Sequence, residues 1–127
     1  METYNPDNPP DPELWLALDE QERISLAEKC HRAARNRLPN VTAHATLHVI
    51  VENQIALELE PVVQAMRRLM KEGLARHEAL HAIGSVVAEY LFDLLGTHQG
   101  GEAGVSPAGC FAAVERLTAT KWREGTR

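Results

Sequence analysis

Residues 44–52 read HATLHVIVE, and residues 77–85 read HEALHAIGS. Both stretches contain the pattern His-x-x-Leu-His-x-Ile, so four of the six histidines of the chain fall into two matching pairs. Side chains four residues apart lie on the same face of a helix, one turn above each other. The spacing therefore predicts two helices, each of which presents two imidazole rings on an apolar face.

Helical periodicity continues outward from these two stretches over most of the chain. Apolar residues recur at helical spacing, prolines stand where helices would begin, and glycines stand where they would end. We expect helices over residues 12–18, 19–38, 41–57, 61–72, 75–95 and 107–121. Because short connections join antiparallel neighbours, the sequence predicts an all-α, up-down helical bundle of about four main helices. The repeated histidine pattern suggests two related helical hairpins.

The 127 residues are expected to form one helical domain with less regular segments on either side. Residues 1–11 are rich in Pro, Asn and Asp, which predicts an extended or disordered arm. The helical bundle is assigned to residues 12–96. The glycine-rich residues 97–106 are expected to be a flexible linker, and residues 107–127 a C-terminal helix and tail.

The charge of the chain limits the partners that we expect, and its cysteines indicate the cellular compartment. A formal net charge of −5 argues against nucleic acid and against an anionic membrane surface, since no basic stripe is available to displace counterions. No apolar run approaches the length of a membrane span, and the first residues lack the basic and apolar regions of a signal peptide. Cys30 and Cys110 are far apart and form no Cys-x-x-Cys motif. We therefore expect a cytoplasmic protein with reduced thiols.

The two histidine pairs have the chemistry and the placement of a metal site. Each pair lies near the start of its predicted helix, and these two helices run parallel in an up-down bundle. His44, His48, His77 and His81 should then lie at a similar level and bind one metal ion together. Imidazole nitrogen suits divalent transition metals, with zinc as the first expectation and iron as the second. Burying four histidines on apolar faces without such a partner would be costly.

Two carboxylates accompany the histidine pairs. Glu52 extends the first pair by one more turn, which makes it a further metal ligand or a supporting group. Glu78 lies inside the second pair, so that residues 77–81 resemble the HExxH motif of zinc metalloproteases. The resemblance implies that Glu78 is a general base for a metal-bound water. It covers five residues only, and Val87 stands where the long form of the motif has a third histidine.

Residues 38–95 also resemble an uncharacterised family of small bacterial all-helical proteins, described as a domain of unknown function. The matching elements are the two histidine pairs, "ENQ" at 52–54, "RL" at 68–69 and "RHEA" at 76–79. The resemblance implies a helical fold and a bacterial, cytosolic setting. It implies no established activity.

Two classes of function are compatible with these patterns. The first is a metal-binding helical protein with a four-histidine site. An open coordination position there would permit metal-dependent hydrolysis of a small-molecule substrate with Glu78 as base, whereas a closed shell of four histidines would be structural or regulatory. The alternative is a metal-free helical module that binds a protein partner through its C-terminal helix or its acidic surface. Neither class excludes a homo-oligomer.

Overall fold

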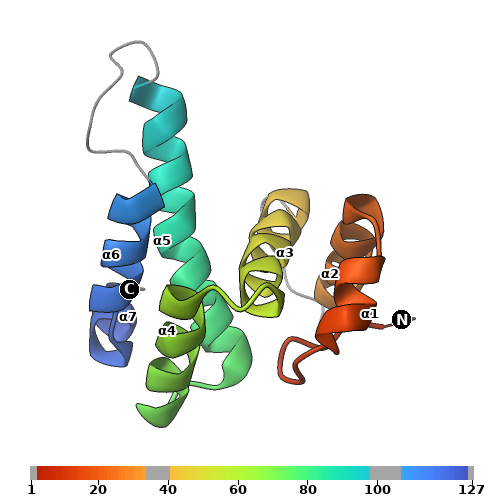
Figure 1. Cartoon of the computed structure of the whole chain (residues 1–127), viewed down its shortest axis with the longest axis horizontal. Coiled ribbons are helices and arrows are strands. Elements are labelled where there is room, and N and C mark those ends of the chain that lie inside the picture. Colours follow the sequence, from red (N-terminus) through yellow and green to blue (C-terminus); the bar gives the residue numbers. More distant parts are fainter. Residues whose placement is uncertain (1–2, 34–40, 98–106, 126–127) are drawn as a thin grey trace.

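The computed structural model describes residues 3–33, 41–97 and 107–125 (Figure 1). These ranges contain helices and no strand, which confirms the predicted all-α fold. The helices are α1 (Pro12–Ala17), α2 (Glu20–Ala33), α3 (Val41–Ala56), α4 (Glu60–Lys71), α5 (Arg76–Thr97), α6 (Pro107–Arg116) and α7 (Ala119–Gly125). The end of the helix expected over 19–38 and nearly all of the predicted linker over 97–106 lie outside the described residues. Within these ranges, no helix combines the length and the apolarity needed to cross a membrane.

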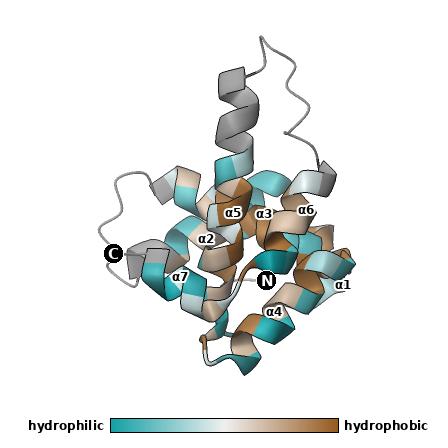
Figure 2. Cartoon of the chain, turned by 90° about the vertical axis from the view of Figure 1, so that its left-hand side faces the viewer, coloured by the Kyte–Doolittle hydropathy of each residue, from teal (hydrophilic) through white to brown (hydrophobic). Residues whose placement is uncertain are grey.

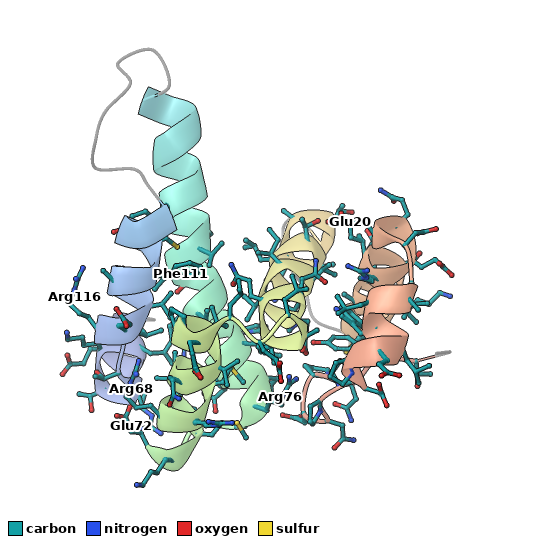
Figure 3. The ribbon with its side chains drawn as sticks, in the orientation of Figure 1. Glu20, Arg68, Glu72, Arg76, Phe111 and Arg116 are labelled. Atoms are coloured by element: carbon teal, nitrogen blue, oxygen red, sulfur yellow. The ribbon has the colours of Figure 1, made fainter. Side chains whose placement is uncertain are left out.

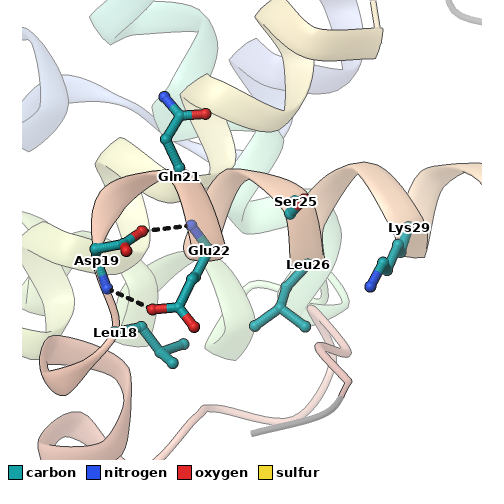
Figure 4. A pocket seen from close by; sticks show the side chains of 7 residues that line it. All are labelled: Leu18, Asp19, Gln21, Glu22, Ser25, Leu26 and Lys29. Carbon is teal, nitrogen blue, oxygen red and sulfur yellow. Dashed lines mark hydrogen bonds between the residues drawn. The ribbon is translucent and has the colours of Figure 1, made fainter.

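The first two helices begin at aspartates that cap them. The side chain of Asp11 accepts hydrogen bonds from the backbone N–H groups of Glu13 and Leu14, and a proline follows in the first turn of α1. Asp19 and Glu22 form a capping box at the start of α2, in which each side chain accepts the other residue's backbone N–H (Figure 4). These caps satisfy N–H groups that the helix itself leaves unpaired.

Helices α3 and α4 both end in the same hydrogen-bonded motif. At the end of α4, the N–H of Gly73 donates to the carbonyl of Met70, and the next N–H donates to the carbonyl of Leu69. This is a Schellman motif, which requires a left-handed residue at its turn. Gly73 supplies it with a φ of 108°, whereas Glu58 occupies the equivalent position after α3 with a φ of 58°.

Helix α3 lies in the middle of the fold and is buried from two sides. It packs against α1 and α2 on one side and against α5 on the other, as Figure 1 shows. Val49 belongs to a small core with Tyr4 and Trp15, while Val51 belongs to a larger core shared with α4, α5, α6 and α7. Hydrophobic and hydrophilic residues alternate along α4, whose buried side chains are Val62, Ala65, Met66 and Leu69 (Figure 2).

The C-terminal part forms two helices where the sequence predicts one over 107–121. Arg68 on α4 donates to the carbonyls of Val114 and Leu117, which closes the end of α6. Glu72, the C-cap residue of α4, accepts the backbone N–H of Ala119 at 2.8 Å at the start of α7. Arg68 and Glu72 lie beside α6 and α7 in Figure 3. Thr118 caps α7 locally, because its hydroxyl accepts the backbone N–H of Lys121 at 3.1 Å, and the contacts from Arg68 and Glu72 hold both sides of the break.

The N-terminal arm lies against the helices. Residues 3–11 contain no helix, in keeping with their composition, but the ring of Tyr4 is buried against Trp15 with 5.4 Å between ring centroids. The carbonyl of Pro6 accepts a hydrogen bond from Arg76 at 2.8 Å, and Asp7 accepts the backbone N–H of His77 at 3.2 Å. The arm thereby connects the start of α5 to the core around Trp15.

Candidate metal centre

Three histidine side chains meet between α3 and α5. His44 and His48 lie one turn apart on α3, and His81 approaches them from α5. The Nε2 atom of His81 lies 2.9 Å from that of His44 and 2.8 Å from that of His48. In the part of the chain that the structure describes, these are the residues with the spacing of metal ligands, and one ligand atom from each lies within 4.8 Å of the others.

The three rings are oriented so that their Nε2 atoms face one another. The plane of His81 makes angles of 86° and 89° with the planes of His44 and His48, respectively. His48 is buried, and the other two are half-buried. The group is therefore shielded on the side of His48 and accessible from the side of the other two rings.

Well-aligned hydrogen bonds cannot join the Nε2 atom of His81 to both of its neighbours at once. A ring nitrogen of neutral imidazole carries either one hydrogen or one lone pair. The Nε2 atom of His81 can therefore form only one well-aligned hydrogen bond, although His44 and His48 both lie within reach of it. A metal ion resolves this conflict because it accepts a lone pair from every ring. Tetrahedral zinc, with Zn–N distances of about 2.0–2.1 Å, places its ligand nitrogens roughly 3.3 Å apart, so the two contacts of His81 need to lengthen only slightly.

A buried polar network continues from the far side of the His48 ring. The hydroxyl oxygen of Tyr4 lies 3.3 Å from Nδ1 of His48, and the hydroxyl donates to Oε2 of Glu52 at 2.6 Å. Both oxygens of Glu52 accept hydrogen bonds from Arg76, at 2.7 and 2.9 Å. Tyr4, Glu52 and Arg76 are 6%, 1% and 6% exposed. The structure thus places Glu52 behind His48, paired with Arg76, rather than in the group of three histidines.

Burial and neighbouring groups shift the pKa values of Tyr4 and Asp7, the two titratable residues through which the arm contacts the helices. Burial raises the pKa of Tyr4 far above its usual range, and the neighbouring negative charge of Glu52 raises it further. Tyr4 therefore remains a hydroxyl at any ordinary pH. A hydrogen bond with His77 lowers the pKa of Asp7, which keeps its carboxylate charged.

His77, expected as a fourth ligand, faces the N-terminal arm. Its Nδ1 atom lies 2.9 Å from Oδ1 of Asp7, which also accepts its backbone N–H. The rings of His77 and His81 are 6.1 Å apart between centroids, as expected for neighbours on one helix face. Asp7 thus holds the His77 ring at the start of α5, and the structure does not bring it into the group of three.

Glu78, expected as a general base, is exposed on α5. It follows His77 directly and therefore points about 100° around the helix from it. It is not part of the three-histidine group. Its role as a base stays a prediction.

A cavity of about 180 Å³ opens beside the histidines. It is lined by His44, Leu47, His48, Leu80, His81, Gly84, Ser85 and Trp122. The walls other than the histidines are mostly apolar, and no acidic, lysine or arginine side chain lines the cavity. Because Trp122 belongs to α7, the C-terminal part of the chain helps to enclose the site.

Sequence reasoning missed Tyr4, Asp7 and Arg76. Arg76 lies within the "RHEA" match, but the match assigned it no role. Tyr4 is an aromatic residue in an otherwise polar, proline-rich arm, and that contrast was the available signal that the arm is anchored. Asp7 had no distinguishing signal among the other acidic residues of the arm.

Comparison with known proteins adds no functional assignment. No known protein family, no curated protein and no solved structure gives a match to this chain. The resemblance of residues 38–95 to a family of small bacterial helical proteins stays a prediction. The geometry of the site is therefore the basis for a functional conclusion.

Proposed function

We propose that the protein binds a divalent transition-metal ion through the Nε2 atoms of His44, His48 and His81. Zinc is the first candidate and iron the second, because imidazole nitrogen suits both and three nitrogen ligands are common in catalytic zinc sites. The supporting observation is the position of His81, whose Nε2 atom lies within 2.9 Å of two other Nε2 atoms. A bound cation would accept a lone pair from all three nitrogens and so stabilise that arrangement.

The cavity favours a metal with an open coordination position. Three protein ligands leave a place for water or for a substrate atom in a four-coordinate site. The cavity beside His44 and His81 provides space there, and its volume of about 180 Å³ suits a small molecule rather than a peptide. Metal-dependent hydrolysis of a small substrate is the activity that we propose for such a site, since a bound metal lowers the pKa of its water.

Metal content measured on untagged protein tests the proposal directly. We expect about one equivalent of zinc or iron in the purified full-length chain, or uptake of about one equivalent of Co²⁺ by the metal-free protein. Metal binding should also raise the melting temperature, because the ion binds only the folded arrangement of the three histidines. A polyhistidine tag must be absent, since it would bind metal itself.

A different result would favour the alternative function. Less than about a tenth of an equivalent of any transition metal, with no uptake on titration and no effect of a chelator on melting, would refute the metal centre. The chain would then be better described as a metal-free helical interaction module. An open coordination position is tested separately, because azide should change the visible spectrum of the Co²⁺ form only if it can reach the metal.

A further inference from the structure

We infer that Tyr4 in the N-terminal arm is a positioning residue for the metal centre, because it determines which ring nitrogen of His48 carries the hydrogen. The inference rests on the proposed metal centre and identifies a residue that orients one of its ligands. Histidines that bind metals usually donate their other ring N–H to a fixed partner, which sets the tautomer and the ring orientation. Tyr4 is placed as such a partner.

The directions of the hydrogen bonds follow from the donors available. Glu52 is paired with Arg76 through both of its oxygens, so it is a carboxylate, which can only accept. The single hydrogen of the Tyr4 hydroxyl therefore points at Glu52, at a distance of 2.6 Å. The oxygen of Tyr4 can then only accept from Nδ1 of His48, 3.3 Å away.

The consequence reaches the other nitrogen of the His48 ring. A neutral imidazole has one N–H group, so a hydrogen on Nδ1 leaves a lone pair on Nε2. Nε2 is the atom of His48 that lies 2.8 Å from Nε2 of His81. The buried chain from Arg76 through Glu52 and Tyr4 thus presents His48 in the form that a metal requires.

The position of Tyr4 is itself well defined. Its ring packs against Trp15 and stands edge-on to His48, at an angle of 81°. Two residues further along the arm, the carbonyl of Pro6 accepts a hydrogen bond from the same Arg76 that holds Glu52. The arm and the buried carboxylate are therefore held by one guanidinium group, and the hydroxyl of Tyr4 has little freedom to turn away.

The Tyr4→Phe variant distinguishes the contribution of the hydroxyl group from that of the ring. The phenyl ring keeps the packing against Trp15, while the hydrogen bonds to His48 and Glu52 are lost. Tyr90→Phe is the matched control, since Tyr90 is the other tyrosine of the chain and is half-buried on α5. Both variants are made in the full-length, untagged protein.

Two measurements read the effect. Long-range ¹H–¹⁵N spectra of the metal-free protein, recorded at mildly alkaline pH, give the tautomer of each histidine. We expect His48 to carry its hydrogen on Nδ1 in the natural protein and in Tyr90→Phe, and on Nε2 or on both nitrogens in Tyr4→Phe. Competition with a chromophoric chelator should show zinc affinity reduced roughly 10–100-fold in Tyr4→Phe alone.

The outcomes distinguish the inference from the proposed function. If Tyr4→Phe lowers the melting temperature or the affinity but leaves the His48 tautomer unchanged, Tyr4 is merely structural and the inference fails. It also fails if the natural protein carries the His48 hydrogen on Nε2. If the natural protein takes up no metal, the metal centre is refuted, and the tautomers in the metal-free protein still decide whether Tyr4 sets the proton of His48.

Discussion

The Nε2 atom of His81 lies within 2.9 Å of the Nε2 atoms of both His44 and His48, and these two contacts join α5 to α3. Substituting His81 therefore removes a ligand and both short contacts at once. We expect His81→Ala to lose nearly all metal binding, whereas His77→Ala keeps it. The zinc content of each variant after dialysis against zinc gives the comparison, and the two substituted residues lie one turn apart on the same helix.

The same pair of variants decides between three and four ligands. If His77→Ala loses metal as completely as His81→Ala, the ring of His77 must leave Asp7 and join the metal when it binds. That result would restore the four-histidine site that the sequence predicts. If neither variant loses metal, the ion binds elsewhere.

The sequence predicts the histidine site in part because helix periodicity is local information. His44 and His48 share a face of α3 by spacing alone, and the packing of α5 against α3 brings His81 to them, as the sequence predicts. The position of the His77 ring depends on its contact with Asp7, which is far away in sequence and lies in an arm with no periodic pattern. No local rule assigns a contact between such a segment and the start of a helix.

The helices, too, are determined partly by local sequence and partly by contacts between distant segments. The apolar spacing and the caps predict most of the helical residues correctly. The break between α6 and α7 combines a local cap at Thr118 with contacts from Arg68 and Glu72, which bind backbone groups of a distant segment. Similarly, the spacing places Glu52 one turn after His48. Its carboxylate pairs with Arg76 because the packing of α5 against α3 brings the two side chains together.

Arg76 and Glu52 form a buried ion pair, and removing one partner should be strongly destabilising. Arg76→Met leaves the carboxylate of Glu52 buried without its counter-charge, which we expect to lower the free energy of unfolding by about 3–5 kcal/mol. Arg67→Met is the control on the exposed face of α4, with an expected change within about 0.5 kcal/mol. Urea denaturation measures both.

The double variant Arg76→Met with Glu52→Gln identifies the cause of that loss. Neutralising the carboxylate removes the unpaired charge, so the double variant should be more stable than Arg76→Met alone. Equal or lower stability of the double variant would mean that packing of the arginine side chain, rather than its charge, holds α3 and α5 together.

The two thiols should react slowly, and one of them should respond to Asp7. Burial raises the pKa of both Cys30 and Cys110, and the charge of Asp7 contributes further at Cys30. A raised pKa means less thiolate at a given pH, so alkylation by iodoacetamide should require a higher pH than for an unfolded peptide. Mass spectrometry after timed alkylation gives the rate at each cysteine.

Asp7→Asn then separates the two causes. Removing the negative charge should lower the pKa of Cys30 and speed its alkylation at fixed pH, while Cys110 remains unchanged. Faster reaction of both thiols would show that the variant loosens the fold as a whole. An unchanged rate at Cys30 would show that burial alone controls it.

The Schellman motifs at the ends of α3 and α4 predict opposite effects of two substitutions. Gly73 has a φ of 108°, and a Cβ added there would lie 3.3 Å from Nη2 of Arg123, so Gly73→Ala should lower stability by about 1 kcal/mol or more. Glu58 adopts a φ of 58°, which costs a residue with a side chain roughly 1–2 kcal/mol. Glu58→Gly should therefore raise stability, by about 0.5–1 kcal/mol after the entropy cost of glycine. Thermal and urea unfolding measure both, and a loss of stability in Glu58→Gly would show that its side chain contributes more than the left-handed backbone costs.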